Sequence, residues 1–355
     1  MPTSITTARV IKDLEQLHVA VNKLTDGYKV FVIADSNVVA HCLPLVMSGL
    51  SASDEIDVIE TEPGEESKSM EVAGHILAHL LECNAGRDTM IINLGGGVIT
   101  DLGGFVASIY KRGIPFINLP TSLLAMVDAS IGGKTGIDHG GIKNSVGTVA
   151  LPAATIIFPD FLETLPAKEI RSGFAEMLKH ALISDGDQWT KLLNIKALNA
   201  KKLYPFLEPS VRIKEAIVAN DLQETAERKL LNFGHTIGHA IEAALIESGS
   251  LITHGEAIAL GMIVETQIAL GLKKINTDAH DEIIAGISKF FSPGKFKVPV
   301  FNTLVPFLMN DKKNKAGEMH MSLVTTAGVA IYDVAVKMAA AKSAYEQVFG
   351  KSPNA

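Results

Sequence analysis

The stretch Ile92–Gly104, INLGGGVITDLGG, joins an apolar run that has the composition of a buried strand to a segment that has the spacing of a helix. The two are connected by three consecutive glycines, which let the backbone approach a ligand closely. The N–H groups at the start of the following helix favour a phosphate. The pattern is not GxGxxG, and a tight strand-to-helix turn without a ligand has the same letters. It therefore predicts a strand–turn–helix unit whose turn is a candidate phosphate site.

Strand-like and helix-like segments alternate on both sides of this unit, up to about residue 160. The runs Tyr28–Asp35 (YKVFVIAD), Glu55–Thr61 (EIDVIET) and Phe116–Ser122 (FINLPTS) are typical of strands. The segment Ser67–Cys83 has apolar residues at helical spacing. This alternation predicts an α/β fold with a mostly parallel sheet covered by helices.

The pattern changes after about Asp160, where long amphipathic segments follow one another. They are LPAKEIRSGFAEMLKHALI, PSVRIKEAIVANDLQETAERKLL and GEAIALGMIVETQIALGL. The late segments MHMSLVTTAG and VAIYDVAV have the composition of strands. We therefore expect two domains, residues 1–159 and a mainly helical one of residues 160–355, with the boundary near Pro159.

Composition and charge argue against several classes of protein. The chain of 355 residues is 47% hydrophobic and has a formal net charge of −7, which gives no support to nucleic acid or an anionic membrane as a partner. Charges interrupt the N-terminus where a signal peptide needs its apolar core, and no apolar run reaches the roughly 18 residues of a membrane span. The two cysteines, Cys42 and Cys83, lie in no metal-binding or redox spacing and are expected to be reduced, buried thiols. These features predict a cytoplasmic protein.

Two polar segments extend the candidate site. PGEESKS (Pro63–Ser69) follows a strand and offers Glu65 and Lys68 to the ribose or base of a dinucleotide. The segment Leu119–Gly147 has few large apolar side chains after Val127, so we expect it to bury little surface and to be ordered by a bound anion. A solvated loop with incidental lysines is the alternative. Its polar groups are Thr121, Ser122, Asp128, Lys134, Thr135, Lys143 and Asn144.

The second half carries acid, base and metal-binding groups on predicted helices. RSGFAEMLKHALI places Glu176, Lys179 and His180 on neighbouring helical positions, although a Glu–Lys pair three residues apart is usually a solvated surface pair. In DLQETAERKLLNFGHTIGHAIE, polar residues recur every three or four positions, which predicts one polar stripe along one helix. The stripe consists of Arg228, Asn232, His235, His239 and Glu242.

Three histidines and Glu176 are candidate metal ligands. His235 and His239 are four residues apart, and His254 directly precedes another predicted helix. Glu and His side chains suit a catalytic zinc-type site with open positions. Spacing alone does not decide whether His235 and His239 form a two-histidine clamp or have different roles, and it does not choose among the three histidines.

In chain order, the segments GGGVITD, PTSLLAMVDASIGGKTGID, KN, GFAEMLK, RKLLNFGHTIGHAIE and HGEAIALGM resemble the 3-dehydroquinate synthase family. The resemblance runs from about Pro63 to Lys313. It implies a Rossmann-like NAD-binding N-terminal domain and a mainly helical C-terminal domain that binds metal and substrate. It also implies a homodimer, NAD and Zn²⁺ (or Co²⁺) as cofactors, and a small sugar phosphate as substrate.

The same resemblance assigns roles to individual residues. The metal would be held by Glu176, His235 and His254, which leaves His239 to the substrate. NAD would be bound by Glu65, Lys68, Gly95, Gly96, Gly97, Val98, Asp101, Thr121, Ser122, Lys134, Lys143, Phe161 and Thr164. Catalysis and substrate binding would fall to Arg112, Asp128, Lys134, Lys143, Asn144, Lys179, Lys214, Arg228, Asn232 and His239, with Lys312 or Lys313 closing over the substrate.

The implied reaction converts 3-deoxy-D-arabino-heptulosonate 7-phosphate to 3-dehydroquinate and phosphate, the second step of the shikimate pathway. NAD would oxidise a ring hydroxyl polarised by the metal, and the new ketone would acidify the adjacent C–H and permit phosphate elimination. Re-reduction, ring opening and an intramolecular aldol closure would follow. Lysines, Arg112 and Asn144 would cradle the charged end of the substrate.

The departures from the family pattern are modest: Ser122, Met126 and Ala129 stand where the family often has Thr, Gln and Ser. Sister sugar-phosphate cyclases share the framework, but Asn232 and His239 are the residues expected of a dehydroquinate synthase. One alternative is a metal- and NAD-dependent alcohol or polyol dehydrogenase, which would release NADH and needs no dense phosphate pocket. The other is a non-catalytic binding protein on the same scaffold.

Overall fold

The computed structural model describes residues 7–51, 56–140, 142–309 and 318–350. The chain forms two compact units, the first of Met1–Ile170 with Asn199–Val211 and the second of Arg171–Leu198 with Arg212–Ala355. Helix α8 (Ala200–Asn220) begins in the first unit and ends in the second. Lys312 and Lys313, expected to close over a substrate, lie outside the described residues.

The first unit is built on a six-stranded parallel sheet with the strand order β1-β8-β5-β4-β2-β3. All seven residues of β4 and the five central residues of β2 are buried, as expected where helices cover both faces of a parallel sheet. This confirms the α/β prediction. The strands are β1 Arg9–Val10, β2 Lys29–Asp35, β3 Ile56–Thr61, β4 Thr89–Gly95, β5 Phe116–Pro120 and β8 Ala154–Ile157.

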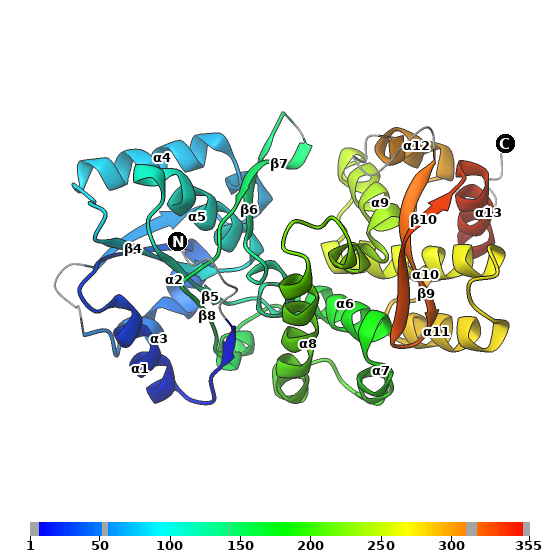
Figure 1. The fold of residues 1–355 in the computed structure, drawn as a ribbon, viewed down its shortest axis with the longest axis horizontal. Coiled ribbons are helices and arrows are strands. Elements are labelled where there is room, and N and C mark those ends of the chain that lie inside the picture. The colour runs from blue at the N-terminus through cyan, green and yellow to red at the C-terminus, as the bar shows by residue number, and fades with distance from the viewer. Residues whose placement is uncertain (1–6, 52–55, 141, 310–317, 351–355) are drawn as a thin grey trace. The chain divides into compact units, whose positions relative to one another are not determined.

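Helices cover this sheet because successive side chains of each strand point to opposite faces. Phe31 and Ile33 of β2 share one core with Ile76 of α4 and Leu102 of α5. Figure 1 shows α4 and α5 on that side of the sheet, and α1 and α3 on the other. The helices of this unit are α1 Leu14–Thr25, α2 Ser36–His41, α3 Leu43–Met47, η1 Glu65–Ser67, α4 Met70–Glu82, α5 Gly97–Ile109, η2 Tyr110–Arg112, η3 Ala125–Ala129 and η4 Pro159–Glu163.

The segment that was expected to be ordered by an anion has its own structure. Strands β6 (Lys134–His139) and β7 (Ile142–Val149) form an antiparallel hairpin. Ile137 of this hairpin is fully buried in the core with α4 and α5. Ahead of the hairpin, Ala125, Met126 and Val127 of η3 are buried as well. The expectation that the segment buries little surface is therefore wrong, because strand pairing and core packing order it.

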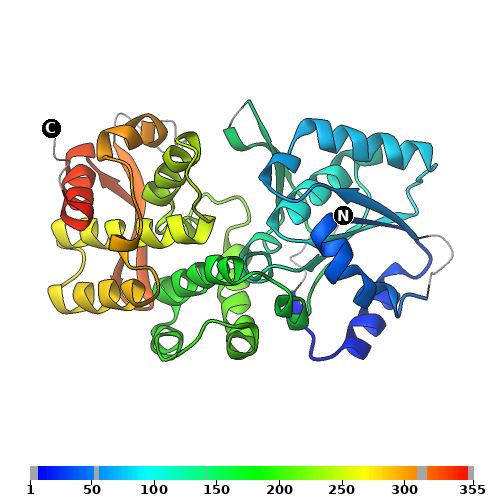
Figure 2. The ribbon, with the colours of Figure 1, turned by 180° about the vertical axis from the view of Figure 1, so that it is seen from behind.

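The second unit is mainly helical and contains one antiparallel hairpin, β9 with β10. Helix α10 is buried along most of its length, and the hairpin runs across α10 and α11 in both views (Figures 1 and 2). Both late strands are as predicted. Within the described ranges, no helix has the length and apolar character needed to cross a bilayer. The elements are α6 Ala167–Ser184, α7 Gly186–Leu193, η5 Glu227–Asn232, α9 His235–Glu247, α10 His254–Gly271, α11 Thr277–Phe290, η6 Pro293–Lys295, α12 Phe301–Met309, β9 Met319–Thr326, β10 Val329–Val336 and α13 Met338–Phe349.

The single helix predicted through the stripe from Arg228 to Glu242 is wrong. The 3₁₀ helix η5 and the α-helix α9 are separated at Phe233–Gly234, where Gly234 has a φ of +81°. Glycine adopts this left-handed conformation at little cost. The buried carboxylate of Glu265 accepts the N–H of Gly234 at 2.6 Å and that of Ile237 at 3.1 Å. A side chain from α10 thus satisfies the first turn of α9 and fixes where that helix begins.

Candidate functional site

The carboxyl ends of β2 and β4 form the topological switch point of the parallel sheet. The next strand after β2 lies on one side, and the next strand after β4 lies on the other. Ligands of open α/β sheets bind outside the strands at such a point. The turn Gly95–Gly97 lies there, and α5 begins at Gly97 without a side-chain cap. The turn therefore presents the backbone N–H groups of a helix start at the place where this architecture binds ligands.

Asp35 is a candidate that the sequence analysis missed. It ends β2 two residues beyond the pairing of Ile33 with Asn93, at the same edge of the sheet as the glycine turn. Asp35 precedes the glycine turn in the chain, but it ends a strand beside the switch point, where a carboxylate can accept a hydrogen bond from a ribose hydroxyl. The Asp35 carboxylate accepts the N–H groups of Asn37 and Val38 at 3.0 and 3.1 Å. The available signal was an aspartate that directly follows a buried apolar run.

Lys68 connects three segments that carry predicted site residues. Its Nζ donates to the Asp101 carboxylate at 2.6 Å and to Oδ1 of Asn144 at 2.5 Å, and the residue is only 4% exposed. Burial by itself would lower the pKa of Lys68, but the negative charges of Asp101 and Glu65 outweigh burial and raise it. The charged ammonium therefore holds the side chain of Asn144, whose own backbone has a φ of +51°.

The remaining predicted residues of the first unit are distributed around the sheet edge and the hairpin. The N–H of Thr121 donates to the carbonyl of Gly95 at 2.9 Å, which places Thr121 beside the turn. Phe161 is buried and contacts Phe158 edge to face, so its ring packs in the core of the first unit. Ser122 accepts the N–H of Ala125, Thr164 ends η4, Asp128 lies in η3, Lys134 begins β6, and Lys143 lies in β7.

Arg112 is not brought to the glycine turn. It lies in η2, directly after α5, whereas the turn precedes this 13-residue helix, and a helix of that length spans about 20 Å. Arg112 has a φ of +67°, and its neighbour Lys111 has a φ of +49°. Such conformations are costly for residues with a Cβ and often mark functional sites.

In the second unit, Glu176, His235 and His254 converge from three helices. Glu176 is fully buried in α6, whereas the two histidines begin α9 and α10. Oε1 of Glu176 lies 3.8 Å from Nε2 of His235 and 3.7 Å from Nε2 of His254. The ring of His239 lies 5.0 and 5.6 Å from the other two imidazoles, centroid to centroid. A carboxylate and imidazole nitrogens at these separations are a donor set that fits a divalent transition metal after small shifts.

The second nitrogen of each histidine is hydrogen-bonded, which orients the first. Nδ1 of His235 donates to the carbonyl of Phe233 at 3.2 Å, and Nδ1 of His254 donates to the Glu242 carboxylate at 3.2 Å. A donating Nδ1 leaves the lone pair of a neutral imidazole on Nε2, which is the atom that lies near Glu176 in both histidines. Glu242, the last residue of the polar stripe, thus orients a predicted metal ligand.

The pKa values of the two histidines are shifted in opposite directions. Burial and the nearby Lys179 ammonium hold the pKa of His235 well below its usual value. Burial also acts to lower the pKa of His254, but hydrogen bonds to Glu176 and Glu242 outweigh it and raise this pKa to about 9. A ligand that binds Nε2 of His254 therefore has to displace a proton, whereas His235 is already neutral.

Close helix contacts hold the three helices in place. A Cβ at Gly255 would lie 1.9 Å from the carbonyl oxygen of Ser172 in α6, and the N–H of Gly255 donates to the Ser172 hydroxyl at 2.9 Å. A Cβ at Gly261 would lie 1.9 Å from the carbonyl oxygen of Gly234, at the start of α9. Helix α10 therefore touches α6 and α9 backbone to backbone, which brings His254 beside the other two predicted ligands.

Lys179 contacts the carboxylate of Glu176 on the same helix, and both side chains are almost completely buried. The alternative of a solvated surface pair is therefore wrong. A buried cation beside a buried carboxylate is retained only where the pair, or a ligand, compensates the loss of hydration. Lys214 of α8 is also buried, at 6% exposed, and His239 lies on α9 one turn after His235.

Arg228 and Asn232 are held by the segment that precedes α9. The carboxylate of Asp221 accepts the N–H groups of Thr225, Ala226 and Arg228 at 2.9, 2.7 and 3.1 Å. Burial opposes ionisation of Asp221, but these backbone hydrogen bonds outweigh it and lower its pKa to about 2. The Asn232 amide donates to Glu224, and the buried Arg228 guanidinium donates to the carbonyl of Leu222 at 2.7 Å.

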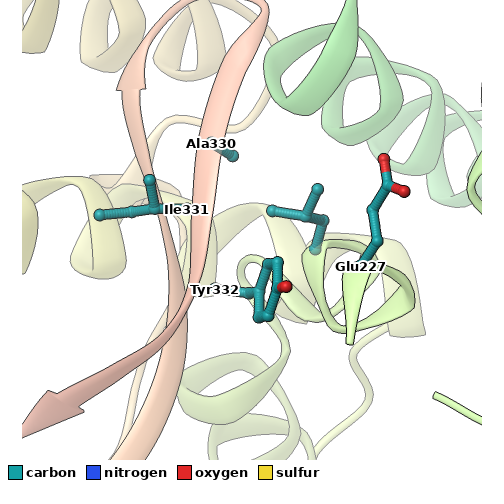
Figure 3. Close-up of a pocket in the computed structure, with 5 residues that line it drawn as sticks. Glu227, Ala330, Ile331 and Tyr332 are labelled. Atoms are coloured by element: carbon teal, nitrogen blue, oxygen red, sulfur yellow. The ribbon is translucent and has the colours of Figure 1, made fainter. Parts of the chain in front are cut away.

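The second unit also has a surface hollow of about 430 Å³ that contains none of the predicted site residues. In Figure 3, Tyr332 lies beside the helix that bears Glu227, while Ile331 points to the opposite side of β10. Its lining is mainly apolar and offers one carboxylate, so it has no converging polar groups for catalysis. The lining residues are Glu227, Leu230, Ala330, Ile331 and Tyr332.

Comparison with known proteins identifies the family. Residues 58–172 match the model of the 3-dehydroquinate synthase N-terminal region, and residues 173–314 match that of its C-terminal region. The 3-dehydroquinate synthase of Parabacteroides distasonis is 37% identical over 302 residues, which cover 84% of this chain and 85% of that protein. These matches agree with the resemblance in the motifs.

Solved structures support the fold. A 2-deoxy-scyllo-inosose synthase, determined with carbaglucose-6-phosphate, NAD⁺ and Co²⁺, superposes with a TM-score of 0.84 at 22% identity, covering 98% of this chain and all of that one. Glycerol dehydrogenase from Schizosaccharomyces pombe gives a TM-score of 0.65 at 14% identity, covering 98% and 91% of the two chains. The similarity in fold thus extends to a polyol dehydrogenase, whereas the two family models that match residues 58–172 and 173–314 are those of 3-dehydroquinate synthase. The chain belongs to the 3-dehydroquinate synthase family, as its motifs predicted.

Proposed function

We propose that this chain is a 3-dehydroquinate synthase that converts 3-deoxy-D-arabino-heptulosonate 7-phosphate to 3-dehydroquinate and phosphate. The observation that carries the proposal is the arrangement of Glu176, His235 and His254. The Nε2 atom of each histidine faces the same carboxylate oxygen, and each Nδ1 is tied to an acceptor. Membership of the family indicates the reaction, and these three side chains could bind the metal that the reaction requires.

We assign NAD to the first unit. Supporting this are the glycine turn at the switch point, the uncapped start of α5, and the acidic Asp35 at the end of β2. The 2-deoxy-scyllo-inosose synthase of similar fold was determined with NAD⁺. Lys68 would contact the cofactor and would also orient Asp101 and Asn144, to which it donates hydrogen bonds. Glu65, Val98, Thr121, Ser122, Lys134, Lys143, Phe161 and Thr164 remain in the proposed cofactor set.

When bound, NAD would take up and return a hydride, and a Zn²⁺ or Co²⁺ ion on Glu176, His235 and His254 would polarise the hydroxyl being oxidised. The chain's own residues would bind and orient the substrate. The buried cations Lys179, Lys214 and Arg228 have been desolvated during folding, so they would attract an anionic substrate strongly. His239 would exchange a proton with the substrate beside the metal ligands.

The division of labour between the two histidines of α9 has a direct test. His235→Ala should lose bound metal and activity together, because it removes a proposed ligand. His239→Ala should retain the metal and lose turnover. Equal loss of metal from both variants would favour the three-histidine set His235, His239 and His254, which offer one ring nitrogen each within 4.8 Å of one another.

The position of Arg112 supports a homodimer in this proposal. Arg112 follows the end of α5 that is opposite to the glycine turn. We therefore assign its positive charge to the substrate site of a second copy of the chain. Mixing inactive Arg112→Ala with inactive His235→Ala should then restore part of the activity, since each mixed dimer has one intact site. No restoration after subunit exchange would place Arg112 in the site of its own chain. A cytoplasmic location belongs to the same proposal and is tested by fractionation of cells.

Phosphate release from the heptulosonate phosphate tests the function. Release should require NAD and should stop when a chelator removes the metal. Release that is indifferent to both would contradict the proposal. The absence of release from any heptulosonate phosphate by metal-loaded protein would favour a non-catalytic binding protein.

A further inference from the structure

A cluster of three potential metal ligands lies in the first unit, outside the residues proposed for the synthase reaction. Asp57 is on β3, His79 is in the last turn of α4, and Cys83 is the residue that directly follows this helix. Oδ2 of Asp57 lies 3.1 Å from Nε2 of His79 and 3.2 Å from Sγ of Cys83, and the nitrogen and sulfur are 3.6 Å apart. Three chemically different donor atoms thus form a small triangle that joins a strand to a helix.

The size of this triangle matches a tetrahedral metal site. Zinc binds carboxylate oxygen and imidazole nitrogen at about 2.0–2.2 Å and thiolate sulfur at about 2.3 Å, so ligand atoms at tetrahedral angles are roughly 3.3–3.6 Å apart. The measured separations of 3.1, 3.2 and 3.6 Å need changes of only a few tenths of an ångström. In the metal-free chain, the thiol and the imidazole N–H of His79 can both donate to Asp57, and a metal would replace these protons.

The cluster is accessible, and its surroundings leave room for a fourth ligand. The side chains of His79 and Asp57 are 40% and 36% exposed. A hollow of about 370 Å³ borders the cluster, and His75, Glu60 and Glu62 line it together with His79. The Lys29 ammonium donates to the carbonyl of Cys83 at 2.8 Å, and its charge repels a cation. The carboxylates of Glu60 and Glu62 attract one.

We propose that Asp57, His79 and Cys83 form a second metal site, which binds Zn²⁺ or another thiophilic divalent ion with one position open to water. The mixture of thiolate, imidazole and carboxylate selects for such ions over Mg²⁺ or Ca²⁺. The site has a structural role, because β3 is the edge strand of the sheet and the metal links it to α4. Cys83 lies in no metal-binding spacing in the sequence because the third ligand, Asp57, comes from a strand 26 residues earlier.

Titration of the full-length protein with Co²⁺, followed by absorption, tests this site. A thiolate-to-cobalt charge-transfer band should appear when Cys83 binds the metal. The band reports this site alone, because the proposed catalytic set of one glutamate and two histidines contains no sulfur. The band and one equivalent of bound metal should be lost in Cys83→Ser and in Asp57→Asn, and both should persist in Cys42→Ala. Zn²⁺ should raise the Tm of the wild type more than that of Cys83→Ser.

Phosphate release from the heptulosonate phosphate distinguishes loss of the second metal site from loss of the synthase reaction. It should be unchanged in Cys83→Ser and Asp57→Asn, which also shows that both variants are folded. The absence of a charge-transfer band at saturating Co²⁺ in the wild type would overturn the second site. So would a band that survives in Cys83→Ser. Neither result depends on whether the synthase activity itself is found.

Discussion

His254 and Glu242 form a hydrogen bond in which Nδ1 of the imidazole donates to the carboxylate at 3.2 Å. The opposite ring nitrogen faces Glu176, so this one contact sets both the tautomer and the direction of the proposed ligand. Glu242 is 6% exposed and is the last residue of the polar stripe, but neither the stripe nor the family resemblance assigns it a role. It positions a ligand without being one.

Glu242→Gln should therefore weaken metal binding by roughly 10- to 100-fold, the usual effect of changing a residue that is hydrogen-bonded to a ligating histidine, because the amide oxygen can still accept the N–H but lacks the charge that strengthens the bond. The side chain keeps its shape, so folding should be little affected. Metal affinity measured by competition with a chelator is the readout. Glu247→Gln, an exposed position on the same helix, is the matched control. Equal affinities in wild type and Glu242→Gln would show that the contact does not orient His254.

Gly255→Ala should disrupt the metal ligands through backbone packing. The added Cβ would lie 1.9 Å from a carbonyl oxygen of α6, and a backbone cannot yield as a flexible side chain does. The expected loss is about 1–3 kcal/mol in the free energy of unfolding, together with weaker metal binding. Gly271→Ala is the control on the same helix, since nothing lies within 4 Å of its Cβ position. If the two variants unfold at the same denaturant concentration, the close contact is not a constraint.

Lys68→Met should impair the enzyme through Asn144. The substitution removes two charge-assisted hydrogen bonds, and the loss of about 1.5–3 kcal/mol for one such bond already corresponds to roughly a 10- to 100-fold fall in kcat/KM. NAD binding should weaken too, because Asp101 loses its partner at the start of α5. Lys23→Met, on the exposed side of α1, should be indistinguishable from the wild type. Unchanged kinetics in Lys68→Met would remove Lys68 from the functional set.

The lowered pKa of Asp221 predicts that the free energy of unfolding falls at acid pH. Its pKa is about 2 in the folded chain against 3.8 without these contacts, so its contribution is complete above about pH 4 and is lost as the pH falls toward 2. Asp221→Asn should be less stable than the wild type at neutral pH, and the difference should narrow across that acid window. Denaturant unfolding at several pH values measures it. A difference between Asp221→Asn and the wild type that stays constant across this pH range would refute the assignment.

The sheet could be predicted because its strands are short apolar runs that end in turn residues. The run before Gly95 is buried on both sides, and its hydrophobicity is visible without any knowledge of the fold. The hairpin of β6 and β7 could not be found in this way. Its strands are polar and glycine-rich, and Ile137 becomes a core residue only through packing against α5.

The break at Gly234 shows a second limit. The three- and four-residue spacing of polar groups continues through it, so periodicity alone favours one helix. What ends the first segment is a left-handed glycine together with Glu265, which lies on another helix. The motifs indicated which side chains carry the chemistry. The partners that orient them, such as Glu242 and Asp221, are set by tertiary contacts that no local pattern encodes.

The most direct test measures phosphate and NADH in the same reaction with the heptulosonate phosphate. The account predicts many equivalents of phosphate per chain and no net accumulation of NADH, because oxidation and re-reduction cancel within each turnover. An alcohol or polyol dehydrogenase on the same fold would instead accumulate NADH in step with substrate loss. That result, or NADH formed without phosphate, would contradict the assignment of this chain as a 3-dehydroquinate synthase.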